Sequence, residues 1–496
     1  MGVIKRQTLY GSLYSYIGVV IGFVTTGILF PNYFTSEEVG LVNMLIAYST
    51  IFAQFASLGF NNATFRLFPY FRNADKKHKG FLFLAVSAAI IGFLLSVGII
   101  LILKPYLTTY HGTMSSLMVS YYIYIVPIVL FVLFFNLFDT YYTVLYNSVI
   151  GTFLKELLLR FLILLAFLGF FYKLFDFHGF VIGFTLSYFL PFLIIFLFLL
   201  RAGQINLRPR LEFLDKNMVR TLSAVSLFGL ISYSTDIIVF NIDRIMIDRL
   251  MGLSDAGIYS TAFLFGAIVM VPSRSLFKIS TTIIADAWKN NDLKTLREIY
   301  SKSCLNQFYI GVLIFLLILV NLENIMQILP KDYGEGKYVI VLISLAMLFN
   351  MVVGINGVLI MTSKEYRMNT YLLFLLAILI FVSNLIFIPQ YGILGSAIAT
   401  MISKLIINVL RAIYVNRKFG MQPYNYKFGL ILLIFGISYL VHILLPVNDN
   451  FILDIIVRSL IILALFGLAS FYLKVSEELN GMVLYIFSLM KKQRKS

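Results

Sequence analysis

Long apolar stretches alternate with short polar segments along almost the whole chain of 496 residues. A helix needs about 20 apolar residues to cross roughly 30 Å of hydrocarbon, since it rises about 1.5 Å per residue. Such a helix satisfies its own backbone hydrogen bonds in lipid, where no water can do so. The pattern therefore predicts an all-α, polytopic membrane protein. About fourteen spans are expected, at 10–30, 39–60, 81–103, 119–141, 157–173, 179–200, 221–242, 257–283, 304–322, 337–361, 370–388, 393–414, 428–446 and 453–474.

The composition excludes a soluble globular protein. Hydrophobic residues make up 60% of the chain and charged residues only 12%, and the mean hydropathy is +0.92. Soluble domains carry about 25% charged residues. A soluble core of this size would leave too much apolar surface in water, so lipid must surround most of the chain.

The polar segments between the predicted spans alternate between rich and poor in lysine and arginine. One set holds roughly 28 of these cations and the opposite set about six. By the positive-inside rule the rich set faces the cytoplasm, which places both termini there. The net charge of +16 then reflects topology and contact with anionic lipids, and nucleic acid is not expected as a partner.

No motif predicts an enzyme or a cofactor site. The single cysteine, Cys304, excludes an intramolecular disulfide and disfavours a cysteine-based metal site. The nearest approach to a phosphate-binding loop, Gly334–Tyr338, lacks the lysine and serine or threonine that end such loops. No polar segment is long enough for a folded domain outside the membrane. We therefore expect no catalytic activity, nucleotide hydrolysis, cofactor or metal.

Internal repetition predicts two halves of six helices. The segment SEEVGLVN at Ser36–Asn43 resembles SDAGIYS at Ser254–Ser260, with Gly40 aligned to Gly257 at an offset of about 217. HGFVIG at His178–Gly183 resembles the start of YGILGSAIAT at Tyr391–Thr400, at an offset of about 213. Six is even, so both halves share one orientation. The predicted domains are a lobe at 1–200, a cytoplasmic linker at 201–220, a lobe at 221–414, two additional spans at 415–474 and a cytoplasmic, amphipathic and basic tail at 475–496.

Two regions resemble a known family. FNIDRIMIDRLMGLSDAGIYSTAF, at Phe240–Phe263, is similar to the span-seven and span-eight signature of polysaccharide transporters in the multidrug/oligosaccharidyl-lipid/polysaccharide (MATE-like) superfamily. LFPNYFTSEEVGLVNMLIAYSTIFAQFASLGFNNATFRLFPYF, at Leu29–Phe71, resembles the acidic-x-Gly-Leu turn, the Leu-Gly segment and the following arginine of that family. The likeness covers the chain, including its fourteen spans.

The resemblance implies two pseudo-symmetric six-helix lobes in a V shape, followed by two C-terminal helices. It also implies a Wzx-type flippase of the bacterial cytoplasmic (inner) membrane. Such a protein moves polyprenyl-diphosphate-linked oligosaccharides to the external leaflet by alternating access, for O-antigen, capsule or exopolysaccharide synthesis. Its partners would be that substrate, membrane lipids, a polysaccharide polymerase and a chain-length regulator.

Three other functions stay open at this point. A multidrug or cation antiporter of the same superfamily would favour an anionic cavity, whereas the charges embedded in the predicted spans include several cations. A flippase of lipid II-type peptidoglycan precursors would handle the same diphosphate-polyprenyl chemistry. A membrane polymerase or glycosyltransferase would need a substantial external loop, and the predicted external loops are at most about 20 residues.

Cations embedded in the predicted spans are the candidates for holding the pyrophosphate. A buried ion costs several kcal/mol unless it is paired or hydrated, so such residues usually face the interior or a water-filled cavity. Lys404 lies about eleven residues into span twelve and is the strongest candidate. For Arg66, Lys278 and Arg160, a side chain that reaches back to the cytoplasmic interface is the alternative. The full candidate set is Lys404, Arg274, Lys278, Arg66 and Arg160.

Two embedded acids are candidates for ion coupling. Asp236 lies within span seven and Asp139 toward the inner end of span four. Burial in an apolar helix disfavours the charged carboxylate, which is the behaviour expected of a proton or sodium site. Pairing with a nearby cation is the structural alternative.

Overall fold

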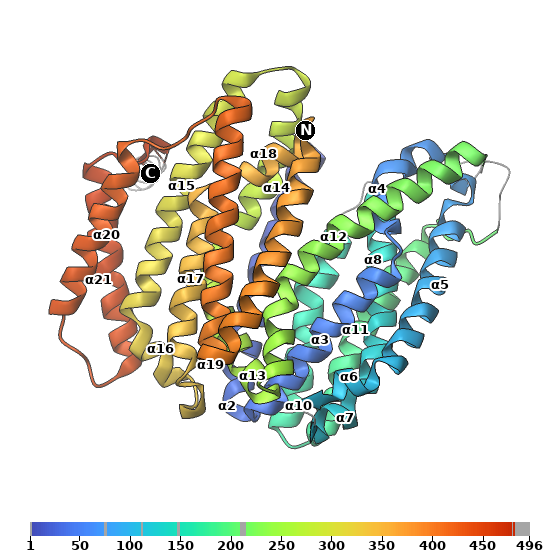
Figure 1. Cartoon of the computed structure of the whole chain (residues 1–496), viewed down its shortest axis with the longest axis horizontal. Coiled ribbons are helices and arrows are strands. Elements are labelled where there is room, and N and C mark those ends of the chain that lie inside the picture. Colours follow the sequence, from blue (N-terminus) through green and yellow to red (C-terminus); the bar gives the residue numbers. More distant parts are fainter. Residues whose placement is uncertain are drawn as a thin grey trace, which may run out of the picture. The chain divides into compact units, whose positions relative to one another are not determined.

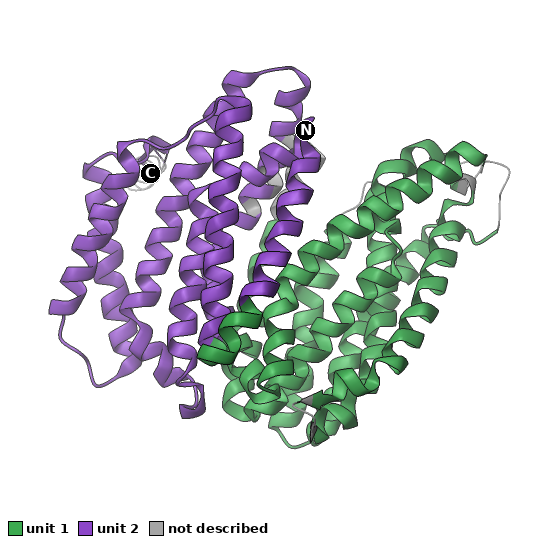
Figure 2. Cartoon of the chain, viewed as in Figure 1, with its two compact units in different colours: residues 1–261, 384–393 green, residues 262–383, 394–496 purple. Residues whose placement is uncertain are grey.

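The computed structural model describes residues 2–73, 77–110, 113–145, 149–208, 215–478 and 480–481. The predicted tail at 475–496 therefore lies largely outside the described residues. The chain forms two compact units, which Figure 2 shows in different colours. Unit 1 comprises residues 1–261 and 384–393, and unit 2 comprises residues 262–383 and 394–496.

Unit 1 is a bundle of helices with one short pair of strands (Figure 1). The antiparallel strands β1 and β2 place Thr109 opposite Met114. The elements are α1 Gly2–Gly22, η1 Phe23–Leu29, α2 Phe30–Tyr33, α3 Ser36–Ala56, α4 Phe60–Phe71, η2 Lys77–Gly80, α5 Phe81–Ile102, α6 Lys104–Thr108, β1 Thr109–Tyr110, β2 Thr113–Met114, α7 Ser116–Tyr121, η3 Tyr122–Tyr124, α8 Ile125–Val144, α9 Val149–Thr152, η4 Phe153–Leu158, α10 Leu159–Phe171, α11 Phe177–Arg201 and α12 Lys216–Leu250. At its centre α8 packs against α3, α5 and α11, and α12 packs along α3 and α4.

Unit 2 is built around α15, which packs against α14, α17, α20 and α21. The helix α13 begins in unit 1 and ends in unit 2. The remaining elements are α13 Leu253–Ala267, η6 Ile268–Met270, α14 Ser273–Lys289, α15 Leu293–Val320, α16 Leu322–Ile328, η7 Lys331–Tyr333, α17 Gly336–Val352, α18 Asn356–Thr362, α19 Tyr366–Phe419, α20 Tyr426–Leu444 and α21 Phe451–Tyr472.

The all-α, polytopic fold is confirmed. Among the described residues, eleven helices are long and apolar enough to cross a membrane, or twelve if α17 and α18, bent by 51°, form one span. The 54-residue α19 covers two predicted spans, which are separated at Gly392 by a backbone conformation (φ 60°, ψ −141°) that glycine adopts readily. The stretch 149–171, which includes most of the predicted span 157–173, is not among the eleven helices. It carries three charged residues, Lys155, Glu156 and Arg160. The count of fourteen stays a prediction, as does the V shape.

The compact units do not follow the predicted domain boundaries. The repeat predicts lobes at 1–200 and 221–414, whereas each compact unit is a set of helices that contact one another. By contact α12 belongs with α3 and α4 in unit 1, and α20 and α21 belong with α15 in unit 2. The division into lobes by repeat remains a prediction.

Polar side chains in the short connections set where helices begin. At the start of α3, Thr35 Oγ1 accepts from the Glu38 N–H at 3.3 Å, and Glu38 Oε2 accepts from the Thr35 N–H at 2.8 Å. This reciprocal pair satisfies two backbone donors that a helix N-terminus leaves open. Asp292 caps α15, and its pKa is lowered by hydrogen bonds from the hydroxyl and N–H of Thr295.

The helices α3 and α13 meet at the two glycines that the repeat aligns. A Cβ on Gly40 would lie 1.9 Å from the carbonyl oxygen of Leu253, and one on Gly257 would lie 2.1 Å from that of Ser36. Gly40 and Gly257 are 217 positions apart (257 − 40), and so are Ser36 and Leu253 (253 − 36). The two contacts are therefore copies of each other under the repeat. Ser36 Oγ and Ser254 Oγ share a hydrogen bond of 2.7 Å beside this crossing.

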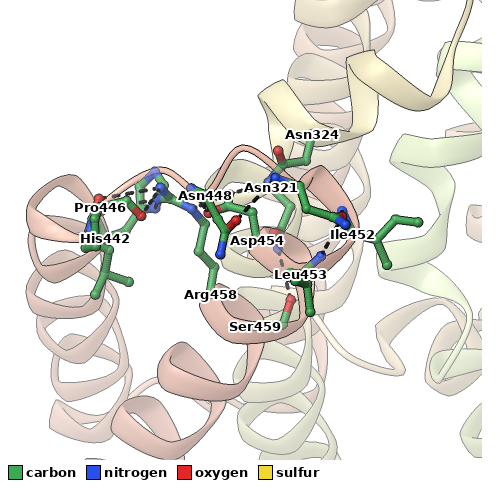
Figure 3. Close-up of polar contacts among 12 residues, drawn as sticks. Asn321, Asn324, His442, Pro446, Asn448, Ile452, Leu453, Asp454, Arg458 and Ser459 are labelled. Carbon is green, nitrogen blue, oxygen red and sulfur yellow. Dashed lines mark hydrogen bonds and ion pairs between the residues drawn. The ribbon is translucent and has the colours of Figure 1, made fainter.

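A buried ion pair holds the last helix of unit 2 (Figure 3). Arg458 Nε donates to Asp454 Oδ2 at 2.5 Å, and both side chains are buried. Arg458 also bonds His442 and donates to the Pro446 carbonyl, so it ties α21 to the end of α20. Asp454 accepts from Asn324 of α16 at 2.6 Å. The pair thus connects three helices at one end of the unit.

Replacing Arg458 with leucine should strongly destabilise the protein. The Asp454 carboxylate would stay buried without its cation, and breaking such a pair costs about 3–5 kcal/mol. The midpoint of thermal unfolding of the detergent-solubilised protein, read by size exclusion, measures the loss. Arg417→Ala, at an exposed position in the last turn of α19, is the control. A double change of Asp454 and Arg458 to leucine should lose less than Arg458→Leu. A single variant as stable as the control would contradict the structural role of the pair.

Gly257→Ala and Gly40→Ala should each destabilise the crossing of α3 and α13. The new methyl group would meet a backbone carbonyl, so the helices must separate, and overpacking of this kind costs about 1–3 kcal/mol. Gly98→Ala is the matched control, because it lies in α5 with no atom within 4 Å of its new Cβ. Thermal unfolding midpoints of the three variants test this expectation, which fails if Gly257→Ala matches Gly98→Ala.

Candidate functional site

A cavity of about 530 Å³ lies inside the helical bundle of unit 1. Its walls come from α3, α8, α11 and α12, which lie together in Figure 1, and from the junction of η4 with α10. Three charged residues line it: Lys155, Asp236 and Arg244. Three amide side chains line it as well: Gln54, Asn136 and Asn241. All six belong to helices, so the cavity is built on rigid elements.

The two cations of the cavity lining come from different helices of unit 1. Arg244 belongs to α12, and its guanidinium lies over the Phe240 ring with 5.1 Å between Cζ and the ring centroid. Lys155 belongs to η4, a π-helical turn between α9 and α10. An arginine stacked on an aromatic ring keeps its donors in one orientation, and a lysine offers a flexible point charge.

Asp236 supplies the negative charge of the lining. It lies on α12 two turns before Arg244, and both residues border the same cavity. Two cations and one carboxylate leave the charged lining with a formal charge of +1. A cavity of this composition favours an anionic group over a cationic one.

The uncharged lining supplies hydrogen bonds and aromatic faces. Asn241 Nδ2 donates to the Ile237 carbonyl at 2.9 Å, within its own helix. Phe131, Phe135 and Tyr188 add aromatic surface. Cations and amide N–H groups bind phosphate oxygens, and aromatic faces pack against apolar faces of a ligand. The cavity therefore combines the groups that a ligand with both phosphate and sugar parts requires.

Two further acids of α12 are committed to hydrogen bonds with neighbouring helices. Asp243 is buried and accepts from Asn384 Nδ2 at 2.8 Å and from the Tyr259 hydroxyl at 2.9 Å. Asp248 accepts from the Tyr48 hydroxyl at 3.3 Å. Asn384 comes from the middle of α19, and its bond to Asp243 helps explain why residues 384–393 group with unit 1.

The structure brings one predicted residue of unit 1 into the cavity and places three others elsewhere. Asp236 lines the cavity, whereas Asp139, Arg160 and Arg66 are not among its lining residues. Asp139 packs so closely against Gly151 that a Cβ there would lie 1.6 Å from its Oδ1. Arg160 forms an ion pair of 2.9 Å with Glu156. Arg66 is exposed on α4.

The other three predicted cations belong to unit 2. Lys404 is partly buried on α19, and its Nζ lies 3.4 Å from Met347 Sδ of α17. Arg274 is exposed on α14. The backbone of Lys278 lies in the same helix, but its side chain is outside the described part of the chain.

Neither Lys155 nor Arg244 is among the site residues predicted from the sequence. Both fall just outside the predicted spans 157–173 and 221–242, because a hydropathy window stops at charged residues. In the structure the helical turns begin earlier, at Val149, and continue later, to Leu250. Their spacing offers a partial signal, since Asp236, Phe240 and Arg244 recur at intervals of four along one helix.

The chain is similar to known membrane proteins. The family described as "Polysaccharide biosynthesis protein" matches residues 4–285. The capsular polysaccharide biosynthesis protein CapF of Staphylococcus aureus is 24% identical over 166 residues, which are 33% of this chain and 42% of CapF. The match thus spans less than half of that relative. The uncharacterized membrane protein MJ1068 of Methanocaldococcus jannaschii is 20% identical over 468 residues, covering 90% of this chain and 91% of that protein.

Two solved structures share the fold. Lipid II flippase MurJ in an inward closed conformation has a TM-score of 0.72 at 13% identity, covering 94% of this chain and 99% of MurJ. An inward-facing multidrug resistance MATE family transporter of the MOP superfamily has a TM-score of 0.62 at 14% identity, covering 84% and 94%. The predicted resemblance is therefore confirmed. This chain is a multi-pass membrane protein with the fold of flippases and transporters, and it belongs to the polysaccharide biosynthesis protein family.

Proposed function

We propose that the chain is a flippase for polyprenyl-diphosphate-linked oligosaccharide repeat units. It moves them from the cytoplasmic to the external leaflet by alternating access, for the synthesis of a surface polysaccharide. It resides in the bacterial cytoplasmic membrane with both termini inside. The observation that carries the proposal is the cavity of unit 1, where Lys155 and Arg244 lie inside an apolar bundle with Asp236.

The chemistry of such a cargo explains this composition. A diphosphate cannot enter an apolar bundle without cations, because burying an unpaired ion costs several kcal/mol. Arginine can bind two phosphate oxygens at once, and lysine adds a second positive charge. The volume of about 530 Å³ falls in the range of small-ligand sites, about 300–1,000 Å³. It suits the diphosphate with its first sugar rather than a whole repeat unit.

The predicted cations complete the proposed pathway. Lys404, Arg274, Lys278 and Arg66 are further proposed contacts of the diphosphate along its path. Arg160 is paired with Glu156 in the same π-helical region as Lys155, so we assign it a supporting role beside the unit 1 cavity. A polysaccharide polymerase and a chain-length regulator are the proposed partners downstream.

Asp236 is the proposed site of ion coupling, with Asp139 as a second candidate. The Asp236 carboxylate offsets part of the charge of Lys155 and Arg244 in the lining of the cavity. Cargo that brings its own negative charges competes with this carboxylate for the same cations. Protonation or a bound sodium ion on Asp236 would relieve that competition, which links ion binding to cargo binding.

A flippase for lipid II-type precursors is the second candidate, because the fold matches MurJ over 94% of this chain. Its cargo carries the same diphosphate-polyprenyl group and would use the same cations. A multidrug antiporter is less compatible with the cavity, since two cations in the lining disfavour a cationic drug.

Lys155→Ala and Arg244→Ala should each slow flipping by about 10- to 100-fold. Hydrogen bonds to charged groups contribute about 1.5–3 kcal/mol, which corresponds to that factor. Proteoliposomes loaded with fluorescent lipid-linked oligosaccharide measure the rate, and membrane abundance is checked in parallel. Lys173→Ala, in the connection between α10 and α11, is the control. Wild-type rates in both cavity variants would refute the assignment of this cavity, and lipid II as a competing cargo separates the two flippase functions.

Asp236→Asn should remove stimulation of flipping by an ion gradient while cargo binding persists. The amide keeps the shape of the side chain but can neither take up a proton nor bind sodium through a carboxylate charge. Initial rates in proteoliposomes with imposed proton or sodium gradients give the comparison. If the wild-type protein is indifferent to both gradients, coupling through Asp236 is excluded.

A further inference from the structure

Three cations recur at intervals of seven along the second half of α19. They are Lys404, Arg411 and Lys418, which we call the α19 basic stripe. Seven residues make almost two helical turns, so the three side chains share one face and follow each other at steps of about 10 Å. Asn408 lies on the same face, between Lys404 and Arg411. The stripe therefore forms a row of polar groups along one helix.

The basic stripe faces α17 and α18 within unit 2. Lys404 Nζ lies 3.4 Å from Met347 Sδ, and Asn408 Nδ2 donates to Asn350 Oδ1 at 2.8 Å. The residue numbers of both partners increase from the first contact to the second, so α19 and α17 run parallel here. A polar seam thus lies between two helices of an otherwise apolar bundle.

Arg411, the next cation of the stripe, lies beside Gly357 of α18. A Cβ on Gly357 would lie 3.8 Å from Arg411 Nη1 and 3.9 Å from Asn369 Oδ1. The guanidinium and this amide therefore both lie beside Gly357. The adjacent Asn356 is buried, and among the described residues its Nδ2 has no hydrogen-bond acceptor. A buried amide donor of this kind normally finds an acceptor.

Lys418 ends the stripe at a carboxylate. Its Nζ lies 2.8 Å from Glu365, which also accepts from the Tyr414 hydroxyl at 3.2 Å. The hydrogen bond from Lys418 lowers the pKa of Glu365, so this carboxylate stays charged at neutral pH. Glu365 lies in the connection between α18 and α19, which the charge pattern assigns to the cytoplasmic side. Lys418 is half-exposed there, at 52% of its side-chain surface.

We infer that the α19 basic stripe is an entry track for the diphosphate group of the cargo. The anion displaces Glu365 from Lys418 at the cytoplasmic end, passes to Arg411 beside Gly357, and is held at Lys404 within the bundle. The inference rests on the proposed function and adds Arg411, Lys418 and Glu365 to the binding path. It follows from the spacing, since an anion that leaves one cation meets the next within about 10 Å and is never far from a countercharge.

A tryptophan lies close to the cytoplasmic end of the α19 basic stripe, where the anion would bind first. Trp288 is the only tryptophan of the chain. Its Nε1 donates to the Leu359 carbonyl at 3.2 Å, and its ring lies 5.0 Å from that of Phe419, the neighbour of Lys418. An anion bound at the cytoplasmic end of the stripe should therefore change the fluorescence of Trp288.

The test is a titration of the full chain in nanodiscs with farnesyl diphosphate, followed by Trp288 fluorescence. Farnesol is the uncharged control ligand. We expect saturable binding of the diphosphate, weakened about tenfold or more in Arg411→Gln, the factor that 1.4 kcal/mol of lost interaction produces. Arg411→Lys should restore part of it. Arg417→Gln, an exposed arginine off the stripe, should bind like the wild type. Thermal unfolding confirms that each variant is folded.

The variant Glu365→Gln tests whether the ion pair of Lys418 and Glu365 takes part in anion binding or has only a structural role. Removal of the competing carboxylate should tighten binding of farnesyl diphosphate, whereas loss of a structural contact would leave the affinity unchanged or lower it. Unchanged or weaker binding in this variant overturns the exchange at Lys418. Equal affinities of Arg411→Gln and Arg417→Gln, in a protein that still flips lipid-linked oligosaccharide, overturn the track and leave the proposed function standing. A wild type that neither binds the diphosphate nor flips the cargo overturns both.

Discussion

The cost of an unpaired charge in an apolar surrounding governs how these helices are arranged. In lipid, each ionic or backbone polar group must find its partner inside the protein, because water is absent. The ion pair of Arg458 and Asp454 meets this requirement by joining α21 to the ends of two other helices. Asp243 meets it through Asn384, a residue about 140 positions away that comes from the middle of α19. Polar side chains therefore select which helices can lie together, and apolar packing fills the space between them.

The same requirement explains how far the sequence predicts the fold. Hydropathy is a local property, so the apolar ranges, the helical class and the polytopic membrane character are readable without the structure. Helix ends are less so, because a charge ends an apolar window but does not end a helix when a partner is present. The helix α12 runs on through Asp243 and Asp248 to Leu250, since Tyr259, Asn384 and Tyr48 bond these acids.

The candidate site could be predicted only in part. An acid inside an apolar helix is visible in the sequence, and Asp236 indeed lines the cavity of unit 1. Which cations join it depends on how α12 packs against α3 and how η4 packs against α11, so Lys155 and Arg244 could not be assigned from spacing alone. The ion pair of Asp454 and Arg458 carries a signal in the sequence, because its two residues are four positions apart on one predicted span. The crossing of α3 and α13 could be predicted in part, since Gly40 and Gly257 occupy equivalent positions of the repeat.

A carrier for an anionic cargo must release what it binds, and the charge distribution fits that demand. A cavity lined only by cations would hold a diphosphate too firmly, because Coulomb attraction grows steeply in a medium of low dielectric constant. Here Asp236 offsets part of the charge of Lys155 and Arg244, and Glu365 forms an ion pair with Lys418. In the flippase that we propose, binding is an exchange of one anion for another, so its net free energy is small although each contact is strong. An exchange of this kind can be reversed by a modest input such as a proton on the competing carboxylate, which gives an ion gradient a point at which to act.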